Sequence, residues 1–372
     1  MTRERARTAA GRRQRSLYRA RRRALLCTLL AVVCGAAAFA AVDHLVNDQP
    51  TTPKRASQTR KARPPTTSTT STEVSEPTPT STYLPAVRWP QRGQAAFVIG
   101  NGEPAVSPDE QPVPIASVAK VMTAYLTLED YPLNGTQDGF TVTVTPADAQ
   151  AEAQDAALDQ SVAPVQAGEQ LTERQMLEGL LIPSGNNMAQ MLAVQVAGSD
   201  TGFVAEMNTE AHTLGMNHTV YTDPSGWNQG TVSTAADQLR VFQQAMRFPV
   251  FDQIISMPSV TLPFAGTLTN TNPLIAEGYA GKTGSDSAAG ACLAFFTHVT
   301  VDGRQQTAVG VVLGQWEDNS TSVVLAAAGE AAEQLVDSVA DAMPTTVTPG
   351  VAGDTGQNGA SQGSLPQPPS RR

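Results

Sequence analysis

The chain has 372 residues and a formal net charge of −9, but its charge is distributed unevenly. The first 23 residues hold ten arginines and one acid, whereas residues 84–343 hold eight lysines and arginines against 28 acids, a formal charge of −20. A stretch this acidic argues against binding to nucleic acid and against adsorption onto anionic lipid.

The N-terminal segment predicts membrane targeting. After the arginine-rich leader of residues 1–23, residues 24–42 contain no charged side chain. This run is just long enough to cross the cytoplasmic membrane as a helix, and the arginines before it keep the N-terminus in the cytoplasm. We therefore expect a single-pass anchor with the rest of the chain outside. Ala38-Phe39-Ala40 also fits a cleavage site, in which case the segment is a signal sequence and the protein is secreted.

Two low-complexity segments flank one domain. Residues 43–83 are dominated by Thr, Ser and Pro, and residues 344–372 by polar residues, Gly and Pro, so neither can bury much apolar surface. We expect both to be disordered, the first as a linker and the second as a tail. The remaining residues, 84–343, suffice for one domain of ordinary size. Their only cysteine is Cys292, so no disulfide can form within this domain.

Within the domain, hydrophobic periodicity and turn residues predict a strand, several helices, a hairpin and a final helix. The predicted strands cover residues 94–100, 291–301 and 304–313, and the predicted helices cover 117–128, 171–181, 187–196, 203–214, 234–246 and 323–343. Pro183 and Gly185 separate two of these helices, which should place Ser184 and Asn186 on an exposed turn. This order predicts an α/β (α+β) fold, an antiparallel sheet flanked by helices with an inserted helical lobe.

Lysine is used sparingly in the domain. Residues 84–343 contain six arginines but only two lysines, Lys120 and Lys282. A lysine can lose its proton and an arginine cannot, so this choice indicates that an amine is needed at both positions. Ser117 lies three residues before Lys120 at the start of a predicted helix, which places both side chains on one face. A neutral Lys120 could take the hydroxyl proton of Ser117, and burial or the nearby cation of Lys282 would lower its pKa enough.

Two further motifs supply polar groups that a nucleophilic serine and a lysine base would need. Ser184 offers a second hydroxyl to relay a proton, and Asn186 offers an amide that can bind a carbonyl or orient a lysine. Lys282 and Thr283 offer a cation and a hydroxyl to a carboxylate, and Gly284 would let a substrate backbone lie against a strand edge. Each motif alone is weak support, but the three together indicate one catalytic site.

The motifs Ser117-Val118-Ala119-Lys120, Ser184-Gly185-Asn186 and Lys282-Thr283-Gly284 resemble those of the penicillin-binding protein superfamily. Specifically, they resemble the serine-type D-alanyl-D-alanine carboxypeptidases of peptidase family S11, the low-molecular-mass penicillin-binding proteins. The segments PIASVAKVMTAYL, GLLIPSGNNMAQMLA, LGMNHTVYTDPSGW and GKTGSDSAAGACLAF extend the similarity over about residues 95–314. Position 119 departs from the family, which usually has Thr there.

The resemblance implies an activity and three catalytic roles. It implies a β-lactamase/transpeptidase-like fold and an enzyme that removes the terminal D-alanine from peptidoglycan stem pentapeptides, is inhibited by β-lactams and uses no metal or cofactor. Ser117 would be the nucleophile that forms the acyl-enzyme, Lys120 the general base and Ser184 the proton relay.

The resemblance also implies how the substrate is bound. Asn186 would hold the substrate and the lysine, while Lys282 and Thr283 would bind the terminal carboxylate. The oxyanion hole would consist of the backbone N–H groups of Ser117 and of Ser285, which follows Gly284. No C-terminal membrane helix or second β-domain is expected, because residues 344–372 are too polar to build either.

Three other interpretations stay open. A class A-like β-lactamase would share two of the motifs, but its middle motif is Ser-Asp-Asn and it needs a glutamate base, for which no residue stands out. A non-catalytic peptidoglycan-binding relative would keep the fold, although the intact motifs argue against it. An endopeptidase acting on cross-links would use the same residues, so the sequence does not separate it from a carboxypeptidase. His212, His218 and His298 form neither a zinc pattern nor a triad pattern.

Overall fold

The computed structural model describes residues 87–301, 303–315 and 321–342, all within the second of two units of the chain, Thr80–Arg372. Our predictions for the leader, the apolar segment 24–42, the linker and the tail lie outside the described residues. Among the helices that are described, none combines the length and the apolar character needed to cross a membrane.

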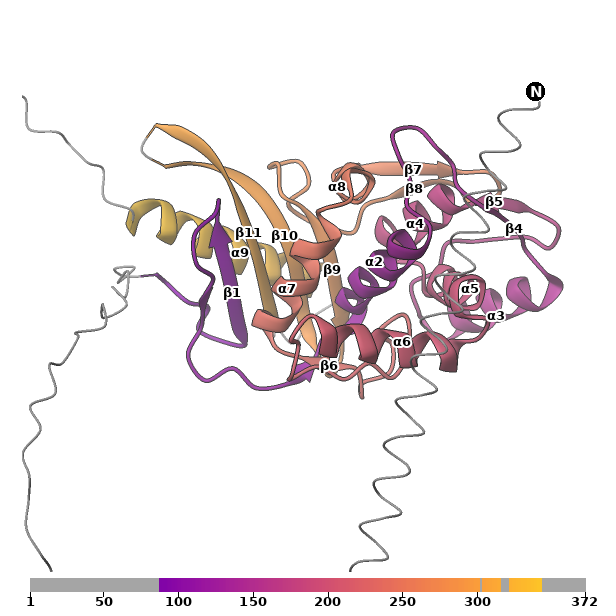
Figure 1. Ribbon diagram of the computed structural model, residues 1–372, viewed down its shortest axis with the longest axis horizontal. Coiled ribbons are helices and arrows are strands. Elements are labelled where there is room, and N and C mark those ends of the chain that lie inside the picture. Colours follow the sequence, from indigo (N-terminus) through magenta and orange to yellow (C-terminus); the bar gives the residue numbers. More distant parts are fainter. Residues whose placement is uncertain (1–86, 302, 316–320, 343–372) are drawn as a thin grey trace, which may run out of the picture. The chain divides into compact units, whose positions relative to one another are not determined.

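A five-stranded antiparallel sheet joins the two ends of the domain (Figure 1). Its strand order is β2-β1-β11-β10-β9, so the first strands of the domain pair with the last. The strands are β1 (Gln94–Ile99), β2 (Ala105–Val106), β9 (Ala280–Asp286), β10 (Gly290–Val301) and β11 (Arg304–Gln315). The predicted hairpin is confirmed, because β10 and β11 pair from Val301 opposite Arg304 onward. The strand β9, which carries Lys282-Thr283-Gly284, lies at one edge.

Both faces of the sheet are covered, so a strand buries the side chains that point to one face as well as those that point to the other. In β1 all six residues are buried: Ala96 and Val98 belong to one apolar cluster, and Phe97 and Ile99 belong to another. This alternation follows from the two-residue period of a strand. We call the side of Ala96 the front face and the side of Phe97 the back face.

The back face is covered by the last helix, α9 (Thr321–Ala342), which packs against β10, β11 and β9. The cluster on this face is apolar and includes the fully buried residues Leu293, Phe295 and Leu335. The rings of Tyr279 and Phe295 are 5.6 Å apart between centroids. Burial of this kind is the main source of stability in a domain without disulfides.

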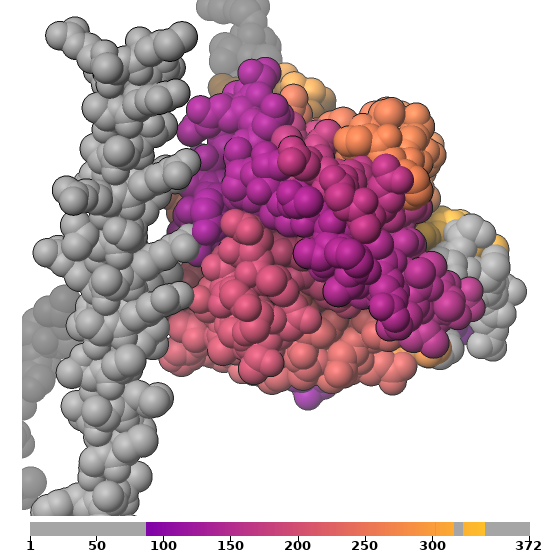
Figure 2. All heavy atoms as spheres, turned by 90° about the vertical axis from the view of Figure 1, so that its right-hand side faces the viewer, coloured from indigo at the N-terminus to yellow at the C-terminus, as the bar shows by residue number. Residues whose placement is uncertain are grey.

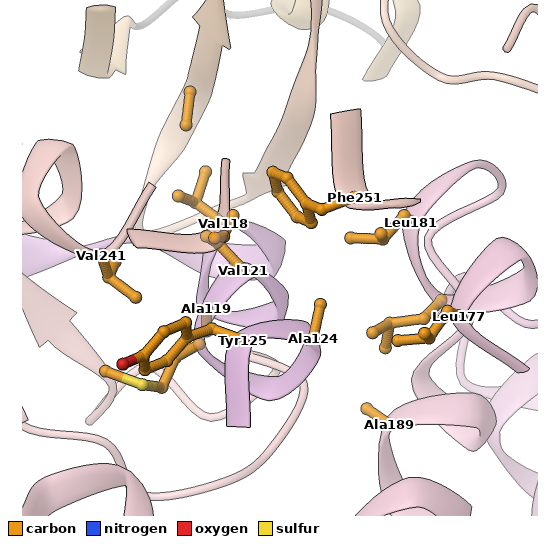
Figure 3. Packing of buried hydrophobic residues seen from close by; sticks show 14 of the residues in the cluster. Val118, Ala119, Val121, Ala124, Tyr125, Leu177, Leu181, Ala189, Val241 and Phe251 are labelled. Carbon is orange, nitrogen blue, oxygen red and sulfur yellow. The ribbon is translucent and has the colours of Figure 1, made fainter. Parts of the chain in front are cut away.

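The front face carries the helical lobe. Its helices are α2 (Lys120–Asp130), α3 (Pro146–Ala157), α4 (Glu173–Leu181), α5 (Asn186–Ala197), α6 (Asp200–Thr213), α7 (Ala235–Ala245) and α8 (Pro249–Ile255). The helix α2 lies at the centre of the lobe, where Val121 and Tyr125 pack among residues of α4, α7 and α8 such as Leu177, Val241 and Phe251 (Figure 3). A helix that is apolar on all sides is typical of a central position in a helical lobe.

Three two-stranded sheets complete the lobe. They pair β3 (Val113–Pro114) with β6 (Val232–Ser233), β4 (Thr141–Thr143) with β5 (Gln170–Thr172), and β7 (Ser259–Leu262) with β8 (Gly266–Thr269). Figure 2 shows the lobe from its outer side, where the orange β7–β8 hairpin adjoins the violet and magenta segments. At this contact Phe264 N donates a hydrogen bond to Glu169 Oε1 (2.9 Å).

Most of the predicted elements are confirmed, and the sequence analysis missed one long helix. The helix α3 has no buried residue, so it lacks the apolar stripe that periodicity detects. Its start is instead marked by a capping box, in which Thr145 and Asp148 bond each other's backbone N–H groups, followed by proline.

Candidate active site

The proposed nucleophile lies on a strained turn before the central helix. Ser117 belongs to a short 3₁₀ helix, Ala116–Ala119, that leads directly into α2. Ala116 has φ +45°, a left-handed conformation that is unusual for a residue with a side chain. Gly226 (φ +79°) packs against this turn, and a Cβ at position 226 would collide with the carbonyl oxygen of Ala116. The surrounding structure thus holds the residue before the serine in a conformation that costs energy, as is common at functional sites.

Lys120 uses all three of its protons within the protein. Its Nζ donates to Ser117 Oγ (2.7 Å), to Asn186 Oδ1 (2.6 Å) and to the carbonyl oxygen of Ser225 (2.9 Å). The side chain is completely buried, and this desolvation lowers the pKa of Lys120 to about 7, although the negative charge of Asp223 acts in the opposite direction. An amine with this pKa is neutral often enough near neutral pH to serve as a base.

A loop that follows α6 holds the third partner of Lys120, and our sequence analysis did not assign it a role. Asp223 Oδ2 accepts hydrogen bonds from Ser225 Oγ (2.6 Å) and Trp227 N (3.0 Å), and its Oδ1 accepts from Thr231 Oγ1 (2.8 Å). Thr123 Oγ1 on α2 donates to Pro224 O (2.6 Å). These bonds fix the carbonyl of Ser225 beside the amine. The only signal in the sequence was the segment TDPSGW, quoted above as part of the resemblance.

The Ser184–Asn186 motif lies between α4 and α5, as predicted, but it is not exposed. The exposed fractions of Ser184 and Asn186 are 4% and 3%, so the expectation of an exposed turn was wrong. The turn folds into the protein because Gly185 N bonds Gly179 O (2.9 Å) and Asn186 N bonds Ser161 O (2.8 Å). Ser184 also has a left-handed backbone, with φ +67°.

Lys282 and Thr283 on β9 lie beside Ser184. Lys282 Nζ donates to Ser184 Oγ (2.9 Å) and to the carbonyl oxygen of Thr283 (2.7 Å). Lys282 is completely buried, and burial, together with the charge of Lys120, lowers its pKa well below the ordinary value. Thr283 is nearly as well covered, with an exposed fraction of 3%. Thr283 Oγ1 lies 2.6 Å from the hydroxyl of Thr271, a second residue that the sequence analysis missed.

Gly284 brings the edge strand against the nucleophile's turn. A Cβ at this position would lie 2.8 Å from Ile115 O and 2.9 Å from Ser117 N, closer than real contacts allow. Ser285 follows on the same strand and is partly exposed. The backbone N–H of Ser117 therefore packs against Gly284, the residue directly before Ser285, in a contact that only glycine permits.

The structure brings all three predicted motifs into one site. Hydrogen bonds join Ser117 to Lys120, Lys120 to Asn186, and Ser184 to Lys282. His212, His218 and His298 are exposed. In the part of the chain that the structure describes, no group of three or more His, Cys, Asp or Glu side chains is arranged to hold a metal ion. The site can therefore support attack by a serine assisted by a lysine.

Comparison with known proteins agrees with this geometry. The family model for Peptidase S11, D-alanyl-D-alanine carboxypeptidase, matches residues 105–316. The chain belongs to this family. A D-alanyl-D-alanine carboxypeptidase of Streptomyces sp. is 31% identical over 223 residues, which are 53% of this chain and 71% of the relative. The crystal structure of the Streptomyces K15 DD-transpeptidase superposes with a TM-score of 0.58 at 25% identity, over 69% of this chain and all of that one. The predicted fold class is thus confirmed.

Other members of the family carry different activity names. A D-alanyl-D-alanine carboxypeptidase of Mycobacterium tuberculosis is 37% identical over 185 residues, or 47% of this chain and 59% of the relative. A D-alanyl-D-alanine endopeptidase of Pseudomonas aeruginosa is 33% identical over 197 residues, or 50% and 60%. The matches thus span about three fifths of these relatives' length.

Proposed function

We propose that the protein is a serine D-Ala-D-Ala carboxypeptidase that removes the terminal D-alanine from peptidoglycan stem pentapeptides through an acyl-enzyme on Ser117. The observation that carries this proposal is the 2.7 Å hydrogen bond between Ser117 Oγ and Lys120 Nζ, whose amine has a pKa of about 7. Family membership supplies the substrate class.

Acylation would begin with the attack of Ser117 Oγ on the carbonyl carbon between the last two D-alanines. Lys120 takes the hydroxyl proton, and the backbone N–H groups of Ser117 and Ser285 stabilise the negative oxygen of the tetrahedral intermediate. The carbon–nitrogen bond then breaks, and a proton returns to the leaving amine through Ser184. D-Alanine leaves, and water hydrolyses the remaining ester to regenerate Ser117.

The hydroxyl groups of Thr283 and Thr271 would bind the terminal carboxylate of the substrate. Thr283 lies next to Gly284 on the edge strand and would donate its hydroxyl to the carboxylate, and Thr271 lies within hydrogen-bond distance of it. Lys282, which donates a hydrogen bond to Ser184, would add positive potential while it is protonated. Asn186 would hold the peptide backbone while it orients Lys120.

Outside the described residues, we propose that residues 24–42 anchor the chain in the cytoplasmic membrane and that residues 43–83 connect this anchor to the domain. The catalytic domain would then act outside the membrane, where its substrate is. β-Lactams should acylate Ser117, because they present a reactive carbonyl in place of the D-alanyl peptide bond.

The test uses the full chain and two synthetic substrates. Free D-alanine should be released from a stem pentapeptide ending in D-Ala-D-Ala, and Ser117→Ala should abolish this release. A cross-linked peptide dimer tests the endopeptidase alternative, which the name of the Pseudomonas aeruginosa relative supports. Cleavage of the dimer without release from the pentapeptide would replace our proposal by the endopeptidase. Turnover of neither substrate by the folded protein would contradict both.

A further inference from the structure

A run of hydrogen bonds enters the site from outside the three motifs. Asp155, in the last turn of α3, accepts a hydrogen bond through Oδ1 from Gln160 Nε2 (3.0 Å). Gln160 Oε1 accepts from Asn186 Nδ2 (2.6 Å), and Asn186 Oδ1 accepts from Lys120 Nζ (2.6 Å). Two amides in series thus connect a carboxylate to the amine beside Ser117.

Each of these amides could be turned end for end with little change in shape, because the oxygen and the NH₂ group of an amide are similar in size. Turning Asn186 would place its NH₂ group against Lys120, donor against donor, whenever the amine is protonated. Gln160 prevents this only if its own oxygen points to Asn186. An ionised carboxylate has acceptors and no donor, so Asp155 accepts only the NH₂ end of Gln160.

We propose that Asp155 and Gln160 are positioning residues, in which the carboxylate of Asp155 fixes the direction of both amides and so keeps Oδ1 of Asn186 facing Lys120. The inference rests on the proposed function, because it treats Lys120 as the base that activates Ser117. When Lys120 accepts the proton of Ser117, the resulting ammonium needs the Asn186 oxygen more than the ground state does.

The backbone of this loop is held independently of the two side chains. Asn186 N donates to Ser161 O (2.8 Å). Asn187 and Ala163 exchange two further bonds, Ala163 N to Asn187 Oδ1 (3.0 Å) and Asn187 Nδ2 to Ala163 O (2.8 Å). Substitutions at positions 155 and 160 should therefore change the direction of the amides without releasing the loop from α5.

The charged groups around the run are few. Burial raises the pKa of Asp155, and hydrogen bonds from Gln160 and Gln190 oppose this shift. Burial, together with the charge of Asp155, raises the pKa of Glu152 on the same helix. At the other end, Asp223 and Lys282 are electrostatically coupled to Lys120. The variants below leave Glu152, Asp223 and Lys282 in place.

The experiment compares three variants of the full chain by the rate at which a fluorescent penicillin acylates them, measured as a function of pH. In Asp155→Asn the new amide can donate or accept, so Asn186 is free to turn. We expect acylation to slow by about tenfold, the loss of one hydrogen bond to a charged group. The acidic limb of the pH profile should also move to lower pH, because a turned Asn186 disfavours the ammonium form of Lys120.

The double variant Asp155→Asn/Gln160→Glu exchanges the amide and the carboxylate. The asparagine then donates to the glutamate, which accepts from Asn186, so the original direction and the net charge are restored. We expect its rate to return to within about threefold of the wild type. Asp159→Asn removes the same charge from an exposed side chain of the same loop, and its rate and pH profile should match the wild type.

Equal rates and pH profiles for Asp155→Asn and the wild type would overturn the inference. So would an equal loss in the single and double variants with an unshifted acidic limb, because that pattern indicates a merely structural role. If the wild type is not acylated at all, the proposed function fails instead. The inference is then decided by ¹³C NMR titration of lysine, since the chain has only four lysines. The pKa of Lys120 should fall in Asp155→Asn, and an unchanged pKa would contradict the inference.

Discussion

Both faces of the sheet bury an apolar cluster, but they differ in the polar groups that are buried with it. On the back face, under α9, the fully buried side chains include Leu293, Phe295 and Leu335, and the cluster is apolar. On the front face, at the edge near α2 and the 3₁₀ helix Ala116–Ala119, the fully buried side chains include Lys120 and Lys282. Apolar burial stabilises the fold. Burial of an amine costs energy, because it disfavours the charged form, and the pKa of the amine falls as a result. Apolar burial thus stabilises both faces, whereas the buried lysines lie on the front face only.

The largest effect should follow from substitution of the front-face amine. Lys120→Arg keeps the charge and much of the length, but an arginine cannot act as a base at neutral pH. We expect acylation by penicillin to fall by about 10²–10⁴-fold, the usual contribution of a general base. The rate per folded molecule is the measurement. A variant that retains more than about a tenth of the wild-type rate would show that Lys120 is not the base.

A smaller effect should follow from moving the edge strand. Gly284→Ala would push a methyl group against Ile115 O and Ser117 N, at 2.8 and 2.9 Å, and displace the turn from β9. We expect acylation to fall by about 10²-fold, the cost of misplacing reacting groups by about 1 Å. Gly202→Ala in α6 is the matched control, since its methyl group would meet no atom closer than 3.1 Å. Equal rates in both variants would contradict the close approach of the two segments.

The pH dependence should report the buried amine directly. With a pKa of about 7, Lys120 becomes neutral as the pH rises, so the acylation rate should increase about tenfold per pH unit below 7 and level off above it. The same shift predicts that stability increases with pH between about 7 and 10.5, because the unfolded chain binds the proton more tightly there. Chemical denaturation at several pH values measures this. An acylation rate that is constant through neutral pH would be inconsistent with Lys120 as the base.

The smallest effect on chemistry should come from the back face. Phe295→Ala removes a completely buried ring and should lower the free energy of unfolding by about 3–5 kcal/mol. The fraction that remains folded should still be acylated at close to the wild-type rate, because Phe295 lies on the opposite side of the sheet from Ser117. A loss of rate beyond the loss of folded protein would show that the two faces are not separable.

Much of this arrangement could be predicted from the sequence. Helices with an apolar stripe, such as α7 and α4, were found by their period, and the β10–β11 hairpin by its Asp-Gly turn signal. The helix α3 was missed because none of its residues is buried, so no apolar stripe marks it in the sequence. The three motifs identified the residues around Ser117 because they are local in the sequence.

What the sequence could not give was the contacts between distant segments. The burial of Ser184 depends on how α4, α5 and the loop at Ser161 fold together, and no local pattern encodes it. Asp223, Thr271 and Gln160 were overlooked for the same reason: each is an ordinary polar residue until the fold places it beside Lys120, Thr283 or Asn186.

The central claim is that Ser117 forms a covalent acyl-enzyme with the help of Lys120. The most direct test is to incubate the full chain with benzylpenicillin, digest it and locate the adduct by peptide mass spectrometry. We predict one penicilloyl group per chain, attached to Ser117 and absent from Ser117→Ala. A folded chain that carries no adduct, or an adduct on another residue, would contradict the account.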